Sequence, residues 1–155
     1  MYNLSNIYVT LYYRGYSKII PGTIGSFFSF IIIFFLYTFF DKIYLYIFFT
    51  VIFFLSLYLI NVYQKIICKT DPSEVVIDEF LGVFIIFIFY DYFNNLNFYT
   101  IMVLGLIFFR IFDILKPFPI NWIDKKIKNS FGVIFYDILA GIYSVICLKV
   151  INGLI

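Results

Sequence analysis

The sequence contains no histidine, and this absence excludes a phosphatase that works through a phosphohistidine. It has only two cysteines, Cys68 and Cys147, whose spacing matches no metal or redox motif. Neither cysteine is followed by an arginine at the spacing of a cysteine-dependent phosphatase loop. An Asp-x-Asp pair and a glycine-rich P-loop are also lacking. Any phosphate chemistry must therefore depend on a metal held by oxygen ligands.

Charge is scarce as well. Only 13% of the residues are charged, against about 25% in ordinary soluble domains. The chain is 64% hydrophobic, with a mean hydropathy of +1.02. A net charge of +2, without any block of like charges, gives no reason to expect a nucleic-acid partner. We therefore expect an all-α integral membrane protein, with residues 1–155 forming one domain.

Long apolar runs predict about five membrane-spanning helices, since a span needs about 20 mostly apolar residues. The first 20 residues show no basic start and apolar core of the kind that marks a secretory leader. Because they are aromatic and only weakly charged, we expect them to lie along the membrane interface. The predicted spans are Ile24–Phe40, Ile43–Val62, Val75–Tyr90, Phe98–Leu115 and Phe131–Ile151.

Basic residues predict the orientation, because lysine and arginine accumulate on the cytoplasmic side of membrane proteins. With the N-terminus inside, the outer segments contain only Lys42 and Lys149. The inner segments then contain eight lysines and arginines: Arg14, Lys18, Lys65, Lys69, Lys116, Lys125, Lys126 and Lys128. We expect a cytoplasmic N-terminus, which places the acids of the last three spans near the inner face.

Two adjacent acids, Asp78 and Glu79, interrupt the apolar stretch EVVIDEFLGVF. Asp71 and Pro72 resemble the cap and first position of a helix, which would place Asp78 roughly 10 Å inside it. One interpretation is an acid pair in a water-filled vestibule, balanced by lysine. The other is a functional site, since acids within a membrane are costly and usually functional, and an adjacent pair suits a cation that prefers oxygen.

The stretch FRIFDILKPFPINWID places Arg110, Asp113 and Lys116 three residues apart along one helical face. Pro117 and Pro119 should then end the helix. A structural Arg–Asp pair with a surface lysine is one explanation. The functional alternative makes Asp113 a metal ligand and lets Arg110 and Lys116 hold a phosphate.

Two further motifs carry small residues. PGTIGS opens the first span, and its Thr23, Gly25 and Ser26 either form an ordinary cap or bind a phosphate at the helix N-terminus. GVIFYDILAGIY places Asp137 four residues before Gly141, as Asp78 precedes Gly82. The glycine spacing is also typical of a close helix crossing, which would not explain the acid.

These four motifs, in this order, resemble the signature blocks of the phosphatidylglycerophosphatase A family. The resemblance implies an inner-membrane lipid phosphatase that requires Mg²⁺ and removes the terminal phosphate of phosphatidylglycerophosphate, a phospholipid substrate, with its active site facing the cytoplasm. By position it implies that Mg²⁺ is bound by Asp78, Glu79, Asp113 and Asp137. Arg110 and Lys116 would clamp the phosphoryl group, next to Thr23, Gly25 and Ser26.

The sequence departs from the family pattern at Tyr136, where the last block usually has the first acid of a doublet. The segment before PGTIGS also differs, since Arg14 to Lys18 replaces a stretch of small residues. Two alternatives to the enzyme follow: an ion-coupled transporter whose buried acids carry H⁺ or Na⁺, and a membrane subunit that has lost its catalytic function.

Overall fold

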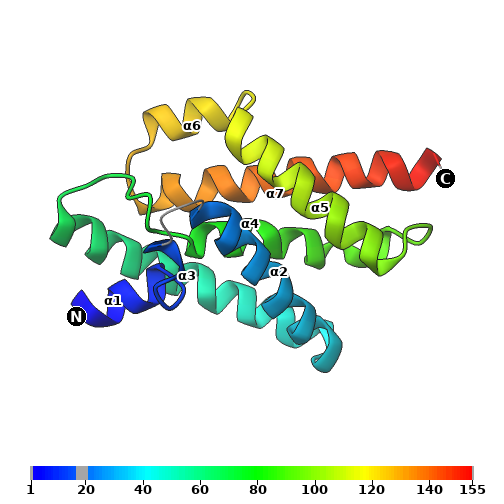
Figure 1. The fold of residues 1–155 in the computed structure, drawn as a ribbon, viewed down its shortest axis with the longest axis horizontal. Helices are drawn as coiled ribbons and strands as arrows, with labels where there is room; N and C mark the ends of the chain where they lie inside the picture. Colours follow the sequence, from blue (N-terminus) through cyan, green and yellow to red (C-terminus); the bar gives the residue numbers. More distant parts are fainter. Residues whose placement is uncertain (1, 17–20, 155) are drawn as a thin grey trace.

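The computed structural model describes residues 2–16 and 21–154, and the regular structure within these ranges is helical (Figure 1). Lys18 and its neighbours, which were assigned to the inner side, lie outside the described residues. The elements are α1 (Tyr2–Val9), η1 (Arg14–Tyr16), α2 (Pro21–Phe39), α3 (Lys42–Ile67), α4 (Ile77–Ile88), η2 (Tyr90–Tyr92), α5 (Phe98–Leu115), α6 (Ile120–Lys126) and α7 (Ser130–Leu154).

Four of these helices, α2, α3, α5 and α7, are long and apolar enough to cross a membrane. The predicted limits of α5 are confirmed at both ends. Asn97 precedes it, and its side-chain oxygen accepts a hydrogen bond from the Thr100 backbone N–H at 2.8 Å. Lys116 ends it in a left-handed conformation, immediately before Pro117.

The predicted span at Val75–Tyr90 is a helix, but it is shorter than expected. Helix α4 has 12 residues, which corresponds to about 18 Å, whereas a membrane core is about 30 Å thick. Every residue from Ile77 to Phe87 is buried, and α4 contacts α2, α3, α5 and α7. The expectation of about five spans is therefore not confirmed. A helix that is apolar all round can face other helices as well as lipid, and its composition does not tell the two apart.

The start of α4 also differs from the prediction. Asp71 and Pro72 do not begin the helix, because residues 68–76 form turns and loop and Val76 is the N-cap. The Val76 N–H donates to the Val9 carbonyl at 2.9 Å, which holds this loop against the end of α1. Asp78 and Glu79 therefore lie in the first turn of α4, where free N–H groups and the helix dipole stabilise negative charge.

The long helices alternate in direction, so the molecule has two distinct ends (Figure 1). The starts of α2, α4 and α7 lie at the same end as the finish of α5. Lys42 and Asp91 form an ion pair at the opposite end, where Asn95 contacts Asn152. This agrees with the predicted grouping of charged residues, and the assignment of one end to the cytoplasm stays a prediction.

Candidate functional site: a buried acidic pocket

Two glycines allow α4 and α7 to touch where they cross. A Cβ atom on Gly141 would lie 2.2 Å from the Gly82 carbonyl oxygen, and one on Gly82 would lie 2.6 Å from the Asp137 carbonyl oxygen. Asp78 and Asp137 each lie four residues, or about one turn, before the glycine of their own helix. The predicted close crossing is correct, and it brings these two acids to the same end of the bundle.

Both acids face a pocket of about 210 Å³ at this end. Its walls come from the loop before α4 and from α4, α5 and α7, so carboxylates from three helices share one cavity. The lining residues are Asp71, Pro72, Ser73, Val75, Asp78, Glu79, Asp113, Tyr136 and Asp137. The structure thus gathers all four acids that the sequence selected as candidate metal ligands.

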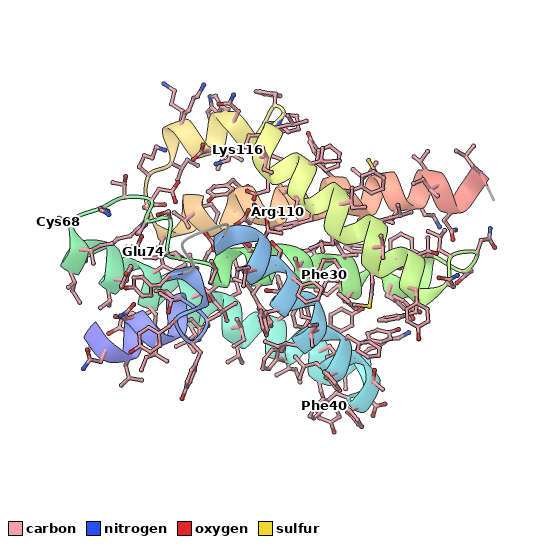
Figure 2. The ribbon with its side chains drawn as sticks, viewed as in Figure 1. Phe30, Phe40, Cys68, Glu74, Arg110 and Lys116 are labelled. Carbon is pink, nitrogen blue, oxygen red and sulfur yellow. The ribbon has the colours of Figure 1, made fainter. Side chains whose placement is uncertain are left out.

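Arg110 links two of these acids on one side of the pocket. Its Nη1 atom lies 2.7 Å from Asp113 Oδ2 and 3.3 Å from Glu79 Oε1. The other Glu79 oxygen, Oε2, lies 2.6 Å from the Ser26 hydroxyl of α2. A guanidinium can hold two carboxylates at once because its donors spread in one plane. Figure 2 shows Arg110 where the start of α2 approaches the end of α5.

The glycines of PGTIGS permit this approach. A Cβ atom on Gly22 would lie 2.4 Å from Glu79 Oε1, and one on Gly25 would lie 3.0 Å from the Val76 side chain. Ser26 is fully buried, and its hydroxyl contacts Glu79, the Gly22 carbonyl and Arg110 Nη1. Thr23 is exposed and lies on the side of α2 that faces Arg110 across a surface groove. Of the three predicted phosphate-binding residues, Thr23 is therefore the accessible one.

Asp137 is the acid whose charge is least compensated. Its residue surface is 1% exposed, no N–H or hydroxyl group of the described residues donates to either carboxylate oxygen, and its side chain contacts the Asp113 carboxyl, which is also an acid. Arg110 Nε is the other buried side-chain atom without a partner in the same part of the chain. Buried polar groups are nearly always satisfied, so a pair of unsatisfied carboxylate oxygens suggests a ligand that supplies positive charge.

Carboxylate oxygens are the ligands that Mg²⁺ prefers, so the chemistry of the pocket fits this ion. Within residues 2–16 and 21–154, however, no three acidic or cysteine side chains lie close enough together to meet the geometry of a metal site. The fit therefore rests on the type of donor and on the free oxygens of Asp137.

Lys116 lies close to the pocket but does not line it. Its Nζ atom is 4.2 Å from the centre of the Tyr136 ring and 3.1 Å from Asp124 Oδ2. A lysine over an aromatic face is held by a cation–π interaction. Tyr136, which stands where the related family usually has an acid, is thus a pocket-lining residue that Lys116 contacts.

Sequence reasoning missed Asp71 as a pocket residue, and it missed the ion pairs of Asp124, which does not line the pocket. Asp71 was interpreted as a helix cap but lines the pocket, and burial raises the pKa of its carboxyl group while the Lys116 charge opposes this rise. Asp124 was assigned to an interface anchor but pairs with both Lys116 and Lys128. The sequence did offer a signal for Asp71, which lies close to Asp78 and Glu79 along the chain. No sequence feature indicated the ion pairs of Asp124.

Long apolar helices around a buried acidic pocket define a helical membrane protein with a polar site near one end. A comparison with protein families gives a closer assignment. The family model described as phosphatidylglycerophosphatase A matches residues 7–152, and the chain belongs to this family.

Individual relatives agree with the family. The chain is 31% identical to the phosphatidylglycerophosphatase A of Escherichia coli over 130 residues, which cover 84% of this chain and 73% of that one. It is 45% identical to the protein of the same name from Haemophilus influenzae over 76 residues, covering 49% of this chain and 44% of that relative. A Bacteroides thetaiotaomicron protein, provisionally named a phosphatidylinositol-3-phosphatase, is 38% identical over 85 residues, or 55% of this chain and 52% of its own. No solved structure matches.

Proposed function

We propose that this protein is a Mg²⁺-dependent phosphatase that hydrolyses phosphatidylglycerophosphate to phosphatidylglycerol and inorganic phosphate. The observation that carries the proposal is the uncompensated carboxylate of Asp137, buried in a pocket with three other candidate ligands and bordered by Arg110. The family and the names of its relatives support the choice of substrate.

In this proposal Asp78, Glu79, Asp113 and Asp137 hold the ion. When bound, Mg²⁺ polarises the phosphoryl group and lowers the pKa of a coordinated water molecule. The two helices that cross at Gly82 and Gly141 fix Asp78 and Asp137 relative to each other. A fixed pair of carboxylates avoids the reorganisation that a flexible site would need on binding.

Glu79 is a candidate general base, but both of its oxygens have partners in the structure, Arg110 and Ser26. No N–H or hydroxyl group of the described residues donates to Asp137, so the Asp137 oxygen that does not hold the ion is the better candidate for this step. Whether the attacking group is this water or a carboxylate that becomes phosphorylated, the same residues surround the reaction.

Arg110 is proposed to bind the phosphoryl oxygens. It has an unused buried donor, Nε, and its guanidinium borders both the pocket and the α2–α5 surface. Charge that builds up on phosphoryl oxygens in the transition state is stabilised by such donors. Lys116 contributes a second positive charge behind Tyr136.

The proposal also includes a location. We place the protein in the bacterial inner membrane with the pocket facing the cytoplasm, because the lysines of α6 and of the segments beside α3 and α7 lie at the pocket end.

Phosphate release from synthetic phosphatidylglycerophosphate by the purified protein, with Mg²⁺ and with a chelator, tests the proposal. We expect release with Mg²⁺ and none with the chelator. Phosphatidylinositol-3-phosphate serves as a second substrate, because one relative is named for that activity. Absence of release from both lipids would favour the two alternatives, and ion flux in proteoliposomes would separate a transporter from a subunit without catalytic function.

A further inference from the structure

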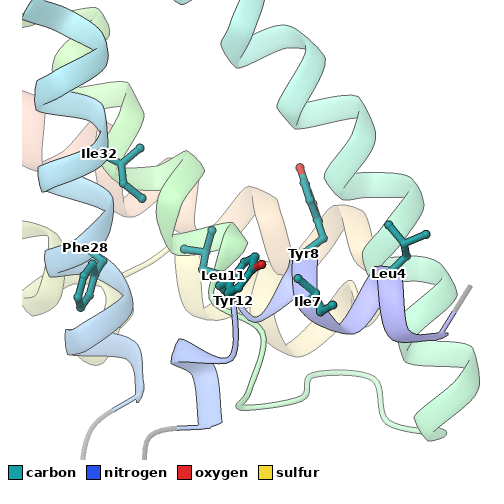
Figure 3. Close-up of a pocket in the computed structure, with 7 residues that line it drawn as sticks. All are labelled: Leu4, Ile7, Tyr8, Leu11, Tyr12, Phe28 and Ile32. Atoms are coloured by element: carbon teal, nitrogen blue, oxygen red, sulfur yellow. The ribbon is translucent and has the colours of Figure 1, made fainter.

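Two open apolar grooves of similar size lie on the surface of the bundle. One, of about 480 Å³, runs between α1 and α2 and is lined by Leu4, Ile7, Tyr8, Leu11, Tyr12, Phe28 and Ile32 (Figure 3). The other, of about 520 Å³, runs between α2 and α5 and is lined by Thr23, Leu106, Ile107, Arg110, Ile111, Ile114 and Leu115. Both could hold an acyl chain.

The two grooves differ in charge. None of the described residues that line the α1–α2 groove is charged, and the hydroxyl of its Tyr8 is already 2.9 Å from Ser56 Oγ. The α2–α5 groove includes Arg110 and the exposed hydroxyl of Thr23 beside a series of apolar side chains. An apolar channel with one cationic residue matches a molecule with a hydrocarbon chain and an anionic head group.

Arg110 also connects the α2–α5 groove to the acidic pocket. The same guanidinium that lines the groove pairs with Glu79 and Asp113, which line the pocket. Arg110 thus lies between the groove and the pocket. Arg110 Nε is buried and has no hydrogen-bond partner in the described part of the chain, so the guanidinium keeps one donor for a phosphate that reaches this side chain from the groove.

We propose that the groove between α2 and α5 is the acyl-chain site of the lipid substrate, which enters sideways from the bilayer and brings its phosphate to Arg110. The inference rests on the proposed function. An apolar groove gains free energy by accepting hydrocarbon of matching shape, whereas the phosphate head group needs a polar residue such as Arg110 as its partner.

The test fills each groove in turn with a larger side chain. Ile111→Trp fills the α2–α5 groove, and Ile32→Trp fills the α1–α2 groove as a matched control, since the two isoleucines are 40% and 41% exposed. Ile107→Trp, at a residue that is 47% exposed, is a second variant in case the first does not fold. Each variant is assayed with diacyl phosphatidylglycerophosphate in vesicles and with the deacylated, water-soluble head group.

We expect Ile111→Trp to lower kcat/KM for the diacyl lipid about tenfold and to leave the deacylated substrate nearly unchanged. Ile32→Trp should alter neither rate. Equal rates for Ile111→Trp and Ile32→Trp on the diacyl lipid would overturn the acyl-chain site while leaving the proposed function intact. An equal loss on both substrates would also overturn it, because that result indicates damage to the chemistry.

A second readout does not depend on turnover. A phosphatidylglycerophosphate analogue with a photoreactive group in its acyl chain should label residues 106–115, and Ile111→Trp should reduce the label. Labelling confined to other helices would contradict the inference. If the wild-type protein releases no phosphate but is labelled on α5, the acyl-chain site stands and the proposed activity fails.

Discussion

The acidic residues near the two ends of the buried helix α4 differ in whether they have a positively charged partner. Beyond its C-terminal end, Asp91 accepts a hydrogen bond from the Tyr37 hydroxyl at 2.8 Å and forms an ion pair with Lys42. Near its N-terminal end, Asp137 receives no hydrogen bond from an N–H or hydroxyl group of the described residues and contacts another acid, Asp113. The side chain of Asp91 is 44% exposed, yet it forms an ion pair with lysine. The fully enclosed Asp137 forms no ion pair within the described residues.

This contrast indicates different roles. At the Asp91 end, polar groups join helices: the Asn95 side chain also donates to the Asn152 carbonyl at 2.9 Å, which fixes the end of α7. At the pocket end, a buried charge without a partner lowers stability, and such an arrangement is expected where a ligand completes the site. Substitutions at the two ends should therefore separate activity from stability.

The largest expected effect is at Asp137. Asp137→Asn should reduce Mg²⁺-dependent phosphate release by about a hundredfold or more, because a ligand of the ion is lost. In the presence of a chelator the same change should raise the free energy of unfolding by about 1 kcal/mol or more, since it removes an acid that is buried beside the acids Asp113 and Asp78. Phosphate assays and thermal unfolding in detergent measure the two effects. A variant that is both active and less stable would contradict the account.

The next effect concerns the crossing of α4 and α7. Gly141→Ala places a methyl group against the Gly82 carbonyl and should cost about 1–3 kcal/mol of stability, together with activity, as Asp78 and Asp137 separate. Gly153→Ala lies on the same helix with no atom within 4 Å of the added group and serves as the control. Similar activity in the two variants would show that the crossing does not position the acids.

Arg110→Lys is expected to have an intermediate effect. Lysine keeps the positive charge but cannot contact Glu79, Asp113 and a phosphate in one plane, so kcat/KM should fall about tenfold or more. Lys125→Arg on the exposed side of α6 is a charge-conserving control. Wild-type rates for Arg110→Lys would contradict the prediction, because they would show that phosphate binding does not need the planar guanidinium.

The smallest effect is expected at the opposite end. Asp91→Asn should lower the melting temperature slightly and leave phosphate release unchanged. The Lys42 hydrogen bond lowers the pKa of Asp91, so the stability that this acid contributes is present at neutral pH and is lost as the pH falls through its pKa in the folded protein. The difference in melting temperature between wild type and Asp91→Asn should therefore disappear in acid. A strong loss of activity would contradict the separation of the two ends.

Much of the helix arrangement could be predicted from the sequence, but the pairing of Asp91 with Lys42 could not. The apolar runs gave the long helices, with α5 found at its observed limits, and alternation of the helices grouped the four acids. The short length of α4 could not be predicted, because its residues are as apolar as those of a span and only packing shows that they face other helices. The hydrogen bond between Glu79 and Ser26 could not be predicted either, since the two residues lie 53 positions apart along the chain.

The central claim is that the acids at the pocket end bind a divalent ion, and Mn²⁺ binding followed by electron paramagnetic resonance tests it most directly. The account predicts that the purified protein binds Mn²⁺ in competition with Mg²⁺. Affinity should fall about tenfold or more in Asp137→Asn and stay unchanged in Asp91→Asn. Equal Mn²⁺ binding by the wild type and Asp137→Asn, or binding that Mg²⁺ does not displace, would contradict the claim.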